Sequence, residues 1–125
     1  MTASAMPLLE RNIDLNKKLL RDTKISVDCQ PLDWSDDSQI EGVHVLIVSD
    51  CTYNPTYFKP LCKTIQLLLE GGNQPTFCLL AKKHRHSDEE GLWLEMKQCK
   101  ISHSILLGQQ AVEEGQWGMW KLTLR

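Results

Sequence analysis

The most constraining feature of the sequence is the run Val-His-Val-Leu-Ile-Val at residues 43–48. β-Branched side chains of this kind favour strands. The run does not alternate between apolar and polar residues, which is typical of a parallel strand covered on both faces. It ends abruptly at Ser49 and Asp50. The sequence therefore predicts an α/β fold in which this strand lies inside a parallel sheet.

Helical and strand patterns alternate along the rest of the chain. Apolar residues recur at helical spacing in three segments, 7–20, 55–70 and 89–99. Strands are predicted at 24–29, 76–81, 100–107 and 117–125, the last two as an antiparallel hairpin. Pro7 and Pro55 suit first helical turns, and Asn54 can cap the helix that follows it. Gly71 and Gly72 should end that helix in the left-handed conformation.

Length and charge exclude several classes of protein. With 125 residues the chain suits one domain or part of a larger one. Its formal net charge of −2 provides no basic excess for binding nucleic acid. No apolar run reaches the roughly 18 residues of a membrane span. Residues 1–7 lack the basic and apolar segments of a secretory signal.

The cysteines and histidines do not form a metal-binding pattern. The five cysteines are widely separated, and neither Cys-x-x-Cys nor His-x₃-His occurs, so we expect no metal site. An odd number of separated cysteines favours reduced thiols in the cytosol or nucleus over a disulfide framework. The phosphate-binding pattern Gly-x-Gly-x-x-Gly and the P-loop pattern are also absent from the sequence.

Two groups of residues at predicted strand ends are candidates for a binding site. Asp50 and Tyr53 follow the strand 43–48, and ligands of open α/β sheets bind beyond the carboxyl ends of the strands. Alternatively, Asp50 satisfies loop amides and Tyr53 packs beneath them. Asp33 and Trp34 follow the first predicted strand, where an indole suits a purine and a carboxylate can accept from an exocyclic amine. Alternatively, Trp34 packs over the sheet edge.

Four motifs together resemble the seven-β-strand protein-lysine methyltransferases of the methyltransferase-like group. They are Leu8-Leu9-Glu10-Arg11-Asn12-Ile13-Asp14-Leu15-Asn16, Leu32-Asp33-Trp34, Val48-Ser49-Asp50-Cys51-Thr52-Tyr53 and Ala81-Lys82-Lys83-His84-Arg85. Their order and spacing follow the family over nearly the whole chain. The resemblance implies a Rossmann-like class I fold that uses S-adenosylmethionine as cofactor and methylates a lysine of a protein substrate.

The resemblance also implies roles for individual residues. Trp34 is similar to the tryptophan that packs on the adenine of S-adenosylmethionine, with Asp33 beside it. Ser49 matches the small strand-end residue whose backbone faces the cofactor. Asp50 and Tyr53 match the motif that borders the lysine channel. Polar atoms there would orient an amine whose ordinary pKa is about 10.4, so that it loses its proton and aligns for transfer.

The sequence departs from the family at its N-terminal end. It contains neither the glycine-rich cofactor loop nor the acidic residue that holds the ribose. We therefore expect residues 1–125 to be a single partial methyltransferase domain. Its Rossmann-like sheet would lack its N-terminal strands and carry a C-terminal antiparallel hairpin. Alternatively, the chain is a non-catalytic remnant that associates through exposed sheet edges, or a hydrolase with Cys51 as nucleophile.

Overall fold

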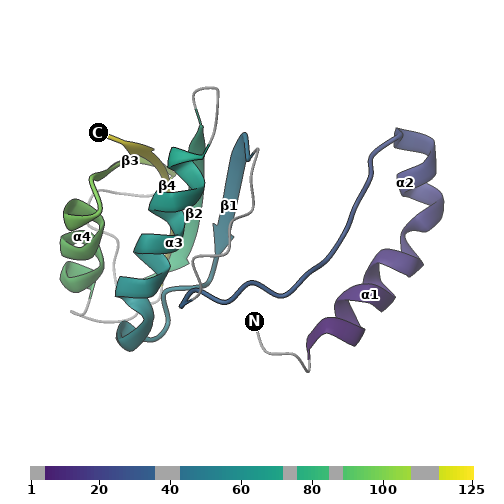
Figure 1. Ribbon diagram of the computed structural model, residues 1–125, viewed down its shortest axis with the longest axis horizontal. Helices are drawn as coiled ribbons and strands as arrows, with labels where there is room; N and C mark the ends of the chain where they lie inside the picture. Colours follow the sequence, from purple (N-terminus) through teal and green to yellow (C-terminus); the bar gives the residue numbers. More distant parts are fainter. Residues whose placement is uncertain (1–4, 36–42, 72–75, 85–88, 108–115) are drawn as a thin grey trace. The chain divides into compact units, whose positions relative to one another are not determined.

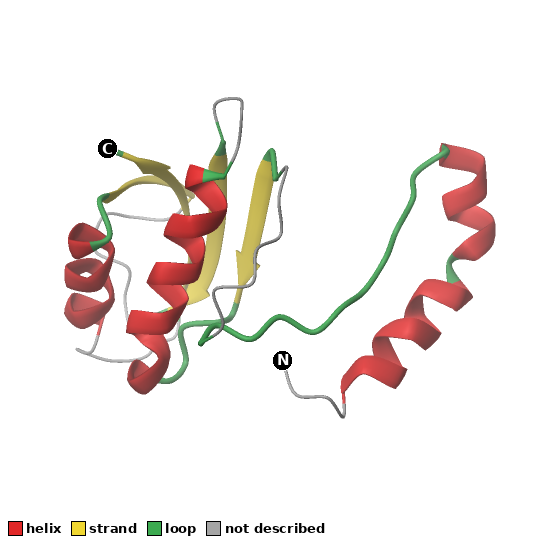
Figure 2. Ribbon diagram, in the orientation of Figure 1, coloured by secondary structure: helices red, strands yellow, loops and turns green. Residues whose placement is uncertain are grey.

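The structure, a computed structural model, describes residues 5–35, 43–71, 76–84, 89–107 and 116–125 (Figure 1). The chain divides into two compact units, Met1–Asp36 and Asp37–Arg125. The described part of the first unit contains helices, and that of the second contains a sheet with helices (Figure 2). The chain is therefore of the mixed α/β class.

The first unit contains two consecutive helices, α1 (Met6–Leu15) and α2 (Lys17–Thr23). Pro7 lies in the first turn of α1, as predicted, where the N–H that proline lacks would have no helical acceptor. At Asn16 the backbone leaves the helical region, with φ −104° and ψ 6°. The Asn16 side-chain amide donates to the Asn12 carbonyl at 2.7 Å. The single helix predicted over 7–20 is thus interrupted once and extends to Thr23.

The strand predicted over 24–29 is wrong. Lys24 ends α2 with a left-handed φ of 56°, and residues 25–33 form neither helix nor strand. The two apolar residues of the pattern, Ile25 and Val27, are exposed. A strand needs a neighbour for its N–H and C=O groups, and no strand of the described residues pairs with this segment.

The second unit is built on a four-stranded sheet of order β1-β2-β4-β3. β1 (Val45–Ser49) runs parallel to β2 (Phe77–Lys83). β4 (Trp117–Leu124) runs antiparallel to β2 and to β3 (Ile101–Leu107). The predicted parallel pair and C-terminal hairpin are therefore confirmed, with β1 at one edge of this sheet and β3 at the other.

Two helices cover one face of the sheet (Figure 1). α3 (Phe58–Glu70) follows the 3₁₀ turn η2 (Pro55–Tyr57), and α4 (Glu89–Gln98) connects β2 to β3. This confirms the helices predicted over 55–70 and 89–99. The most deeply buried apolar side chains lie between these helices and the sheet: Leu61, Cys62, Ile65, Cys78, Leu80, Leu92, Met96, Ile101 and Leu122.

The two ends of α3 differ in how well the sequence predicted them. Asn54 Oδ1 accepts from the Thr56 N–H at 3.0 Å, which confirms the cap. At the other end Gly71 has a right-handed φ of −75°, and its N–H donates to the Leu67 carbonyl at 3.1 Å. Gly71 therefore does not form a left-handed stop, and Gly72 lies outside the described residues.

On the opposite face of the sheet in the second unit, the β1–β2 pair is apolar and open. Ile47 is 73% exposed and Val45 is 47% exposed, so the prediction that this strand is covered on both faces is wrong within the unit. The reason is that α3 and α4 lie on the same side of the sheet (Figure 1). Val45 and Ile47 are in register with the half-buried Phe77 and Leu79 of β2. These four apolar residues lie on the face of the sheet opposite α3 and α4.

Candidate functional site

Asp50 lies at the carboxyl end of β1, as predicted. Its N–H donates to the Ala81 carbonyl at 3.0 Å, which extends the parallel ladder one residue beyond Ser49. Its φ of 52° lies in the left-handed region, which aspartate tolerates better than most residues. Backbone strain of this kind is often found at binding sites. The turn at Asp50 directs the chain out of the sheet and leaves the Asp50 side chain exposed.

The loop that follows Asp50, residues 51–54, is fixed in place by Thr52 and Asn54. Thr52 is buried beneath it, and the Asn54 cap fixes its junction with η2. Tyr53, between these two residues, is 62% exposed. The alternative in which Tyr53 packs beneath the loop is therefore wrong. Its hydroxyl is accessible to a ligand at the same strand end as Asp50.

Cys51 does not have the surroundings of a catalytic nucleophile. The thiol is half-buried and donates to the Ser49 carbonyl at 3.3 Å. Burial raises the pKa of Cys51, and the negative charge of Asp50 adds to this effect. Reactive cysteines require the opposite, a pKa lowered toward neutrality. This argues against the hydrolase alternative.

Ser49 is the last residue of β1 and is exposed. It is paired in register with Ala81, and alternation along the strand places its side chain on the same side as Ile47. Ser49, Asp50 and Tyr53 thus form a short polar rim at the end of the parallel pair, and we use the term rim for these three residues. That the Ser49 backbone faces a cofactor stays a prediction.

Asp33 and Trp34 belong to the first unit. Asp33 Oδ1 accepts from the Ser35 N–H at 2.9 Å and from the Ser35 hydroxyl at 2.6 Å. The Ser35 hydroxyl, followed by the Ser35 N–H, lowers the pKa of Asp33. This is a turn in which an aspartate bonds to the backbone two residues later, and it positions the half-buried Trp34 between the two. The structure thus groups the rim in one unit and this turn in the other.

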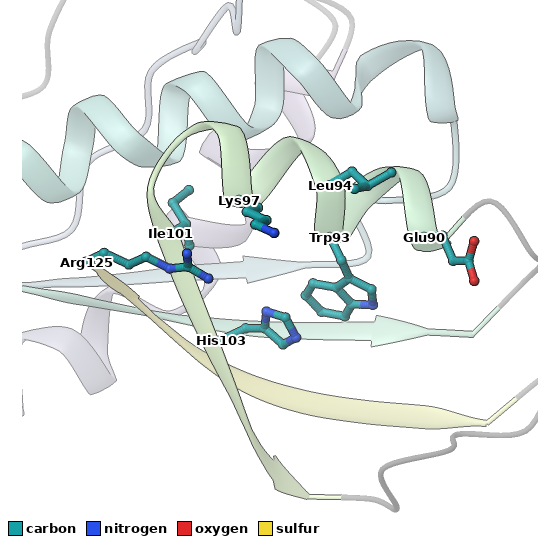
Figure 3. Close-up of a pocket in the computed structure, with 7 residues that line it drawn as sticks. All are labelled: Glu90, Trp93, Leu94, Lys97, Ile101, His103 and Arg125. Carbon is teal, nitrogen blue, oxygen red and sulfur yellow. The ribbon is translucent and has the colours of Figure 1, made fainter.

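A pocket that the sequence patterns did not indicate lies in the second unit between α4 and β3 (Figure 3). It has a volume of about 350 Å³, is shallow, and is called here the α4–β3 groove. Its lining residues are Glu90, Trp93, Leu94, Lys97, Ile101, His103 and Arg125. The sequence contains one feature that could have indicated this groove, which is the spacing of Glu90, Trp93, Leu94 and Lys97. A helix places residues with this spacing on one face. The other three lining residues, Ile101, His103 and Arg125, come to the groove only through strand pairing.

The described residues contain neither a metal-binding cluster nor a membrane-spanning helix. No three His, Cys, Asp or Glu side chains gather there in a way that could hold a metal ion. No helix in the described ranges combines the length and the apolar character that a bilayer crossing requires.

The fold and the rim together define a class: an α/β protein with polar side chains at the end of a parallel strand, where this architecture binds ligands. The family of lysine methyltransferases has a sequence model that matches residues 2–99. The chain therefore belongs to this family, which confirms the resemblance and assigns the protein to the methyltransferases. No curated protein matches the chain.

Proposed function

We propose that the protein is a protein-lysine N-methyltransferase that uses S-adenosylmethionine. The observation that carries this proposal is the family match over residues 2–99, because it includes both the Asp33–Trp34 turn and the rim. The exposed rim supports it, since a transferase for a protein side chain needs polar groups that a bulky substrate can reach. The substrate would be a protein with an accessible lysine.

The chemistry of Asp33 and Trp34 fits the adenine end of S-adenosylmethionine. Trp34 offers an indole face for adenine. Both hydrogen bonds that hold the Asp33 turn end on Oδ1, so Oδ2 can accept from the exocyclic amine of the base. Bound S-adenosylmethionine would supply an electrophilic methyl group on a sulfonium. The ribose carboxylate and glycine loop of the family are not in the sequence, so cofactor binding is expected to need more chain than residues 1–125.

The residues of the rim would act on the lysine. Methyl transfer forms an N–C bond as the C–S bond breaks, so the amine must first release its proton, here to solvent at the open rim. The Tyr53 hydroxyl and the Asp50 carboxylate can accept hydrogen bonds from the remaining N–H groups. Two such bonds would point the nitrogen lone pair along the line of attack. Asp50 and Tyr53 are therefore the proposed catalytic residues.

Calorimetric titration with S-adenosylmethionine tests this proposal. Residues 1–125 and a form extended by the residues encoded upstream of Met1 are titrated in parallel. We expect the extended form to bind, and Trp34→Ala to weaken binding at least about tenfold because it removes base stacking. A folded extended form that does not bind would overturn the proposal.

A matched pair of tyrosine variants tests the role of the rim. Tyr53→Phe should keep cofactor affinity and lower the transfer of tritiated methyl to lysines of a protein extract at least about tenfold. Tyr57→Phe removes the hydroxyl of another exposed tyrosine, in η2, and should change neither quantity. Equal transfer by the two variants would exclude Tyr53 from catalysis.

A second candidate function, a non-catalytic interaction module, is favoured by the exposed edge of β1. The Asp50 N–H bonds to Ala81, so alternation along a parallel ladder turns the N–H groups of Val45, Ile47 and Ser49 toward the edge that faces no described strand. Such an edge can pair with a strand of a second copy. Sedimentation tests this candidate: Ile47→Lys should abolish self-association, Leu19→Lys should not, and a stable wild-type monomer would count against it.

A further inference from the structure

The helical wall of the α4–β3 groove carries opposite charges at its two ends. Glu90, Leu94 and Lys97 lie on one face of α4, since their spacing brings them to the same side of a helix. At a rise of 1.5 Å per residue, Glu90 and Lys97 are separated by about 10 Å along the axis. Leu94 lies between them and is 60% exposed. An exposed apolar side chain therefore separates an anion from a cation.

The floor of the groove is formed by Trp93 of α4 and His103 of β3. The His103 imidazole stacks on the Trp93 indole, with ring centroids 4.1 Å apart and an angle of 17° between the planes. Burial, and then the charge of Arg125, lowers the pKa of His103. The lowered pKa favours the neutral imidazole. The buried Lys82 ammonium lies 6.0 Å from the centroid of the Trp93 ring.

Arg125 adds a second cation at the Lys97 end. Its N–H donates to the Lys100 carbonyl at 2.8 Å, and its Nε donates to the Ser102 hydroxyl at 3.1 Å. These bonds hold the guanidinium beside the groove, with Nη atoms that can bind a carboxylate. Figure 3 shows Arg125 at one end of the groove, Glu90 at the other end, and Lys97 and the aromatic pair between them.

We propose that the α4–β3 groove binds a segment of a protein partner in the polyproline II conformation, which carries an acidic residue and a basic residue three positions apart, with apolar residues between them. Polyproline II has three residues per turn and a rise of about 3.1 Å, so side chains three positions apart lie on one face about 9 Å apart, close to the separation of the charges on α4. The acidic side chain would lie against Arg125 and Lys97, the basic one against Glu90, and the apolar ones against Leu94 and Trp93.

This inference does not depend on methyl transfer. Ile101, His103 and Arg125 follow the residues that the family model matches, and the groove is formed by α4 and the C-terminal hairpin, whereas the rim lies at the end of β1. A shallow, partly polar groove is suited to a peptide rather than to a small molecule, which would leave most of its surface in water.

Fluorescence anisotropy with two labelled peptides tests the proposal on the full chain. The first peptide is Gly-Gly-Glu-Leu-Leu-Lys-Gly-Gly, and the second has Gln in place of Glu and Lys. We expect the charged peptide to bind at least about tenfold more tightly than the neutral one, with a difference that shrinks at high salt because exposed charges are screened. Equal affinities, or no binding of either peptide, would overturn the proposal.

Exchanging the positive charges of the groove for negative ones distinguishes a loss of peptide recognition from a loss of the fold. The double variant Lys97→Glu with Arg125→Glu should weaken binding of the charged peptide at least about tenfold, and should gain binding of a third peptide, Gly-Gly-Lys-Leu-Leu-Lys-Gly-Gly. A misfolded variant could not gain a ligand. Lys59→Glu, an exposed residue of α3 outside the groove, is the control and should leave the ranking of the first two peptides unchanged. A double variant that keeps the wild-type ranking of the peptides would overturn the proposal.

Discussion

Helices α1 and α3 have the same kind of apolar pattern and different surroundings. None of the residues of α1 is buried. By contrast, α3 buries Phe58, Leu61, Cys62, Ile65, Leu68 and Leu69. The sheet of the second unit supplies the apolar surface against which α3 packs, whereas the described part of the first unit has no strand. The comparison shows that apolar periodicity specifies a helix, while its burial requires a partner surface.

The largest expected difference between the two units is in thiol reactivity. Burial raises the pKa of Cys62 in α3 and of Cys78 in β2 to about 12, whereas Cys29 in the first unit is only partly covered. Alkylation by iodoacetamide requires the thiolate. At pH 8 we expect Cys62 and Cys78 to react at least about 100-fold more slowly than Cys29, as measured by mass spectrometry of digests.

The same shift has a consequence for stability at alkaline pH. The unfolded chain releases these two protons near the ordinary pKa of 9.0, while the folded chain retains them up to about 12. The unfolded state therefore binds fewer protons in this range, and stability should fall as the pH rises above about 9. Rapid labelling of Cys62 in native buffer would contradict the packing of α3.

The second prediction compares leucine truncations in the two helices. Leu61→Ala removes a buried side chain of α3 and should lower the free energy of unfolding by about 3 kcal/mol, because it leaves a cavity. Leu15→Ala in α1 removes an exposed side chain and should change it by less than about 0.5 kcal/mol. Urea denaturation followed by circular dichroism measures both. Equal losses would mean that α1 is packed as tightly as α3.

The third prediction concerns packing within the second unit. A Cβ on Gly118 would lie 2.5 Å from Cη2 of the Trp120 ring, and Trp120 is buried. Gly118→Ala should therefore destabilise the protein by about 1–3 kcal/mol. Gly91→Ala in α4 is the matched control, because among the described residues its Cβ would meet only Phe58, at 3.9 Å. It should stabilise the protein by about 0.5–1 kcal/mol through helix propensity. Thermal unfolding distinguishes the two, and a neutral Gly118→Ala would contradict the close approach.

The smallest expected effect is at the starts of the helices. The Asn54 side chain caps the entry to η2 and α3, whereas Ala5 before α1 makes no side-chain capping bond. Asn54→Ala should cost about 1 kcal/mol of unfolding free energy, and Asn54→Asp should restore it. Ala5→Ser should add helical ellipticity to α1. If Asn54→Asp is as unstable as Asn54→Ala, the capping bond is not the cause of the loss.

The sequence predicted the second unit better than the first. The run 43–48 correctly predicted a parallel strand, and Asn54 with Pro55 correctly predicted the start of the next helix. Both predictions succeeded because β-branching and capping act over a few residues. The strand over 24–29 failed because alternation of Ile25 and Val27 is a local pattern, while a strand exists only with a hydrogen-bonding neighbour.

The sequence also predicted some features of the candidate site and missed others. The sequence placed Asp50 and Tyr53 at a strand end, and the structure agrees, because the end of an apolar run is a local feature. It could not decide whether Tyr53 was packed or exposed, since that depends on Thr52 and the capped turn around it. The α4–β3 groove was not predicted, because His103 reaches Trp93 only through the pairing of β3 with β4 and the packing of α4.

The sequence by itself determined the order of helices, the parallel strand with its polar end, the hairpin and the membership of a methyltransferase family. These follow from side-chain spacing and chemistry along the chain. Only the tertiary structure decided which face of the sheet is covered, which tyrosine is accessible and which charges share a groove. These depend on residues far apart in sequence, whose proximity is set by strand pairing and helix packing.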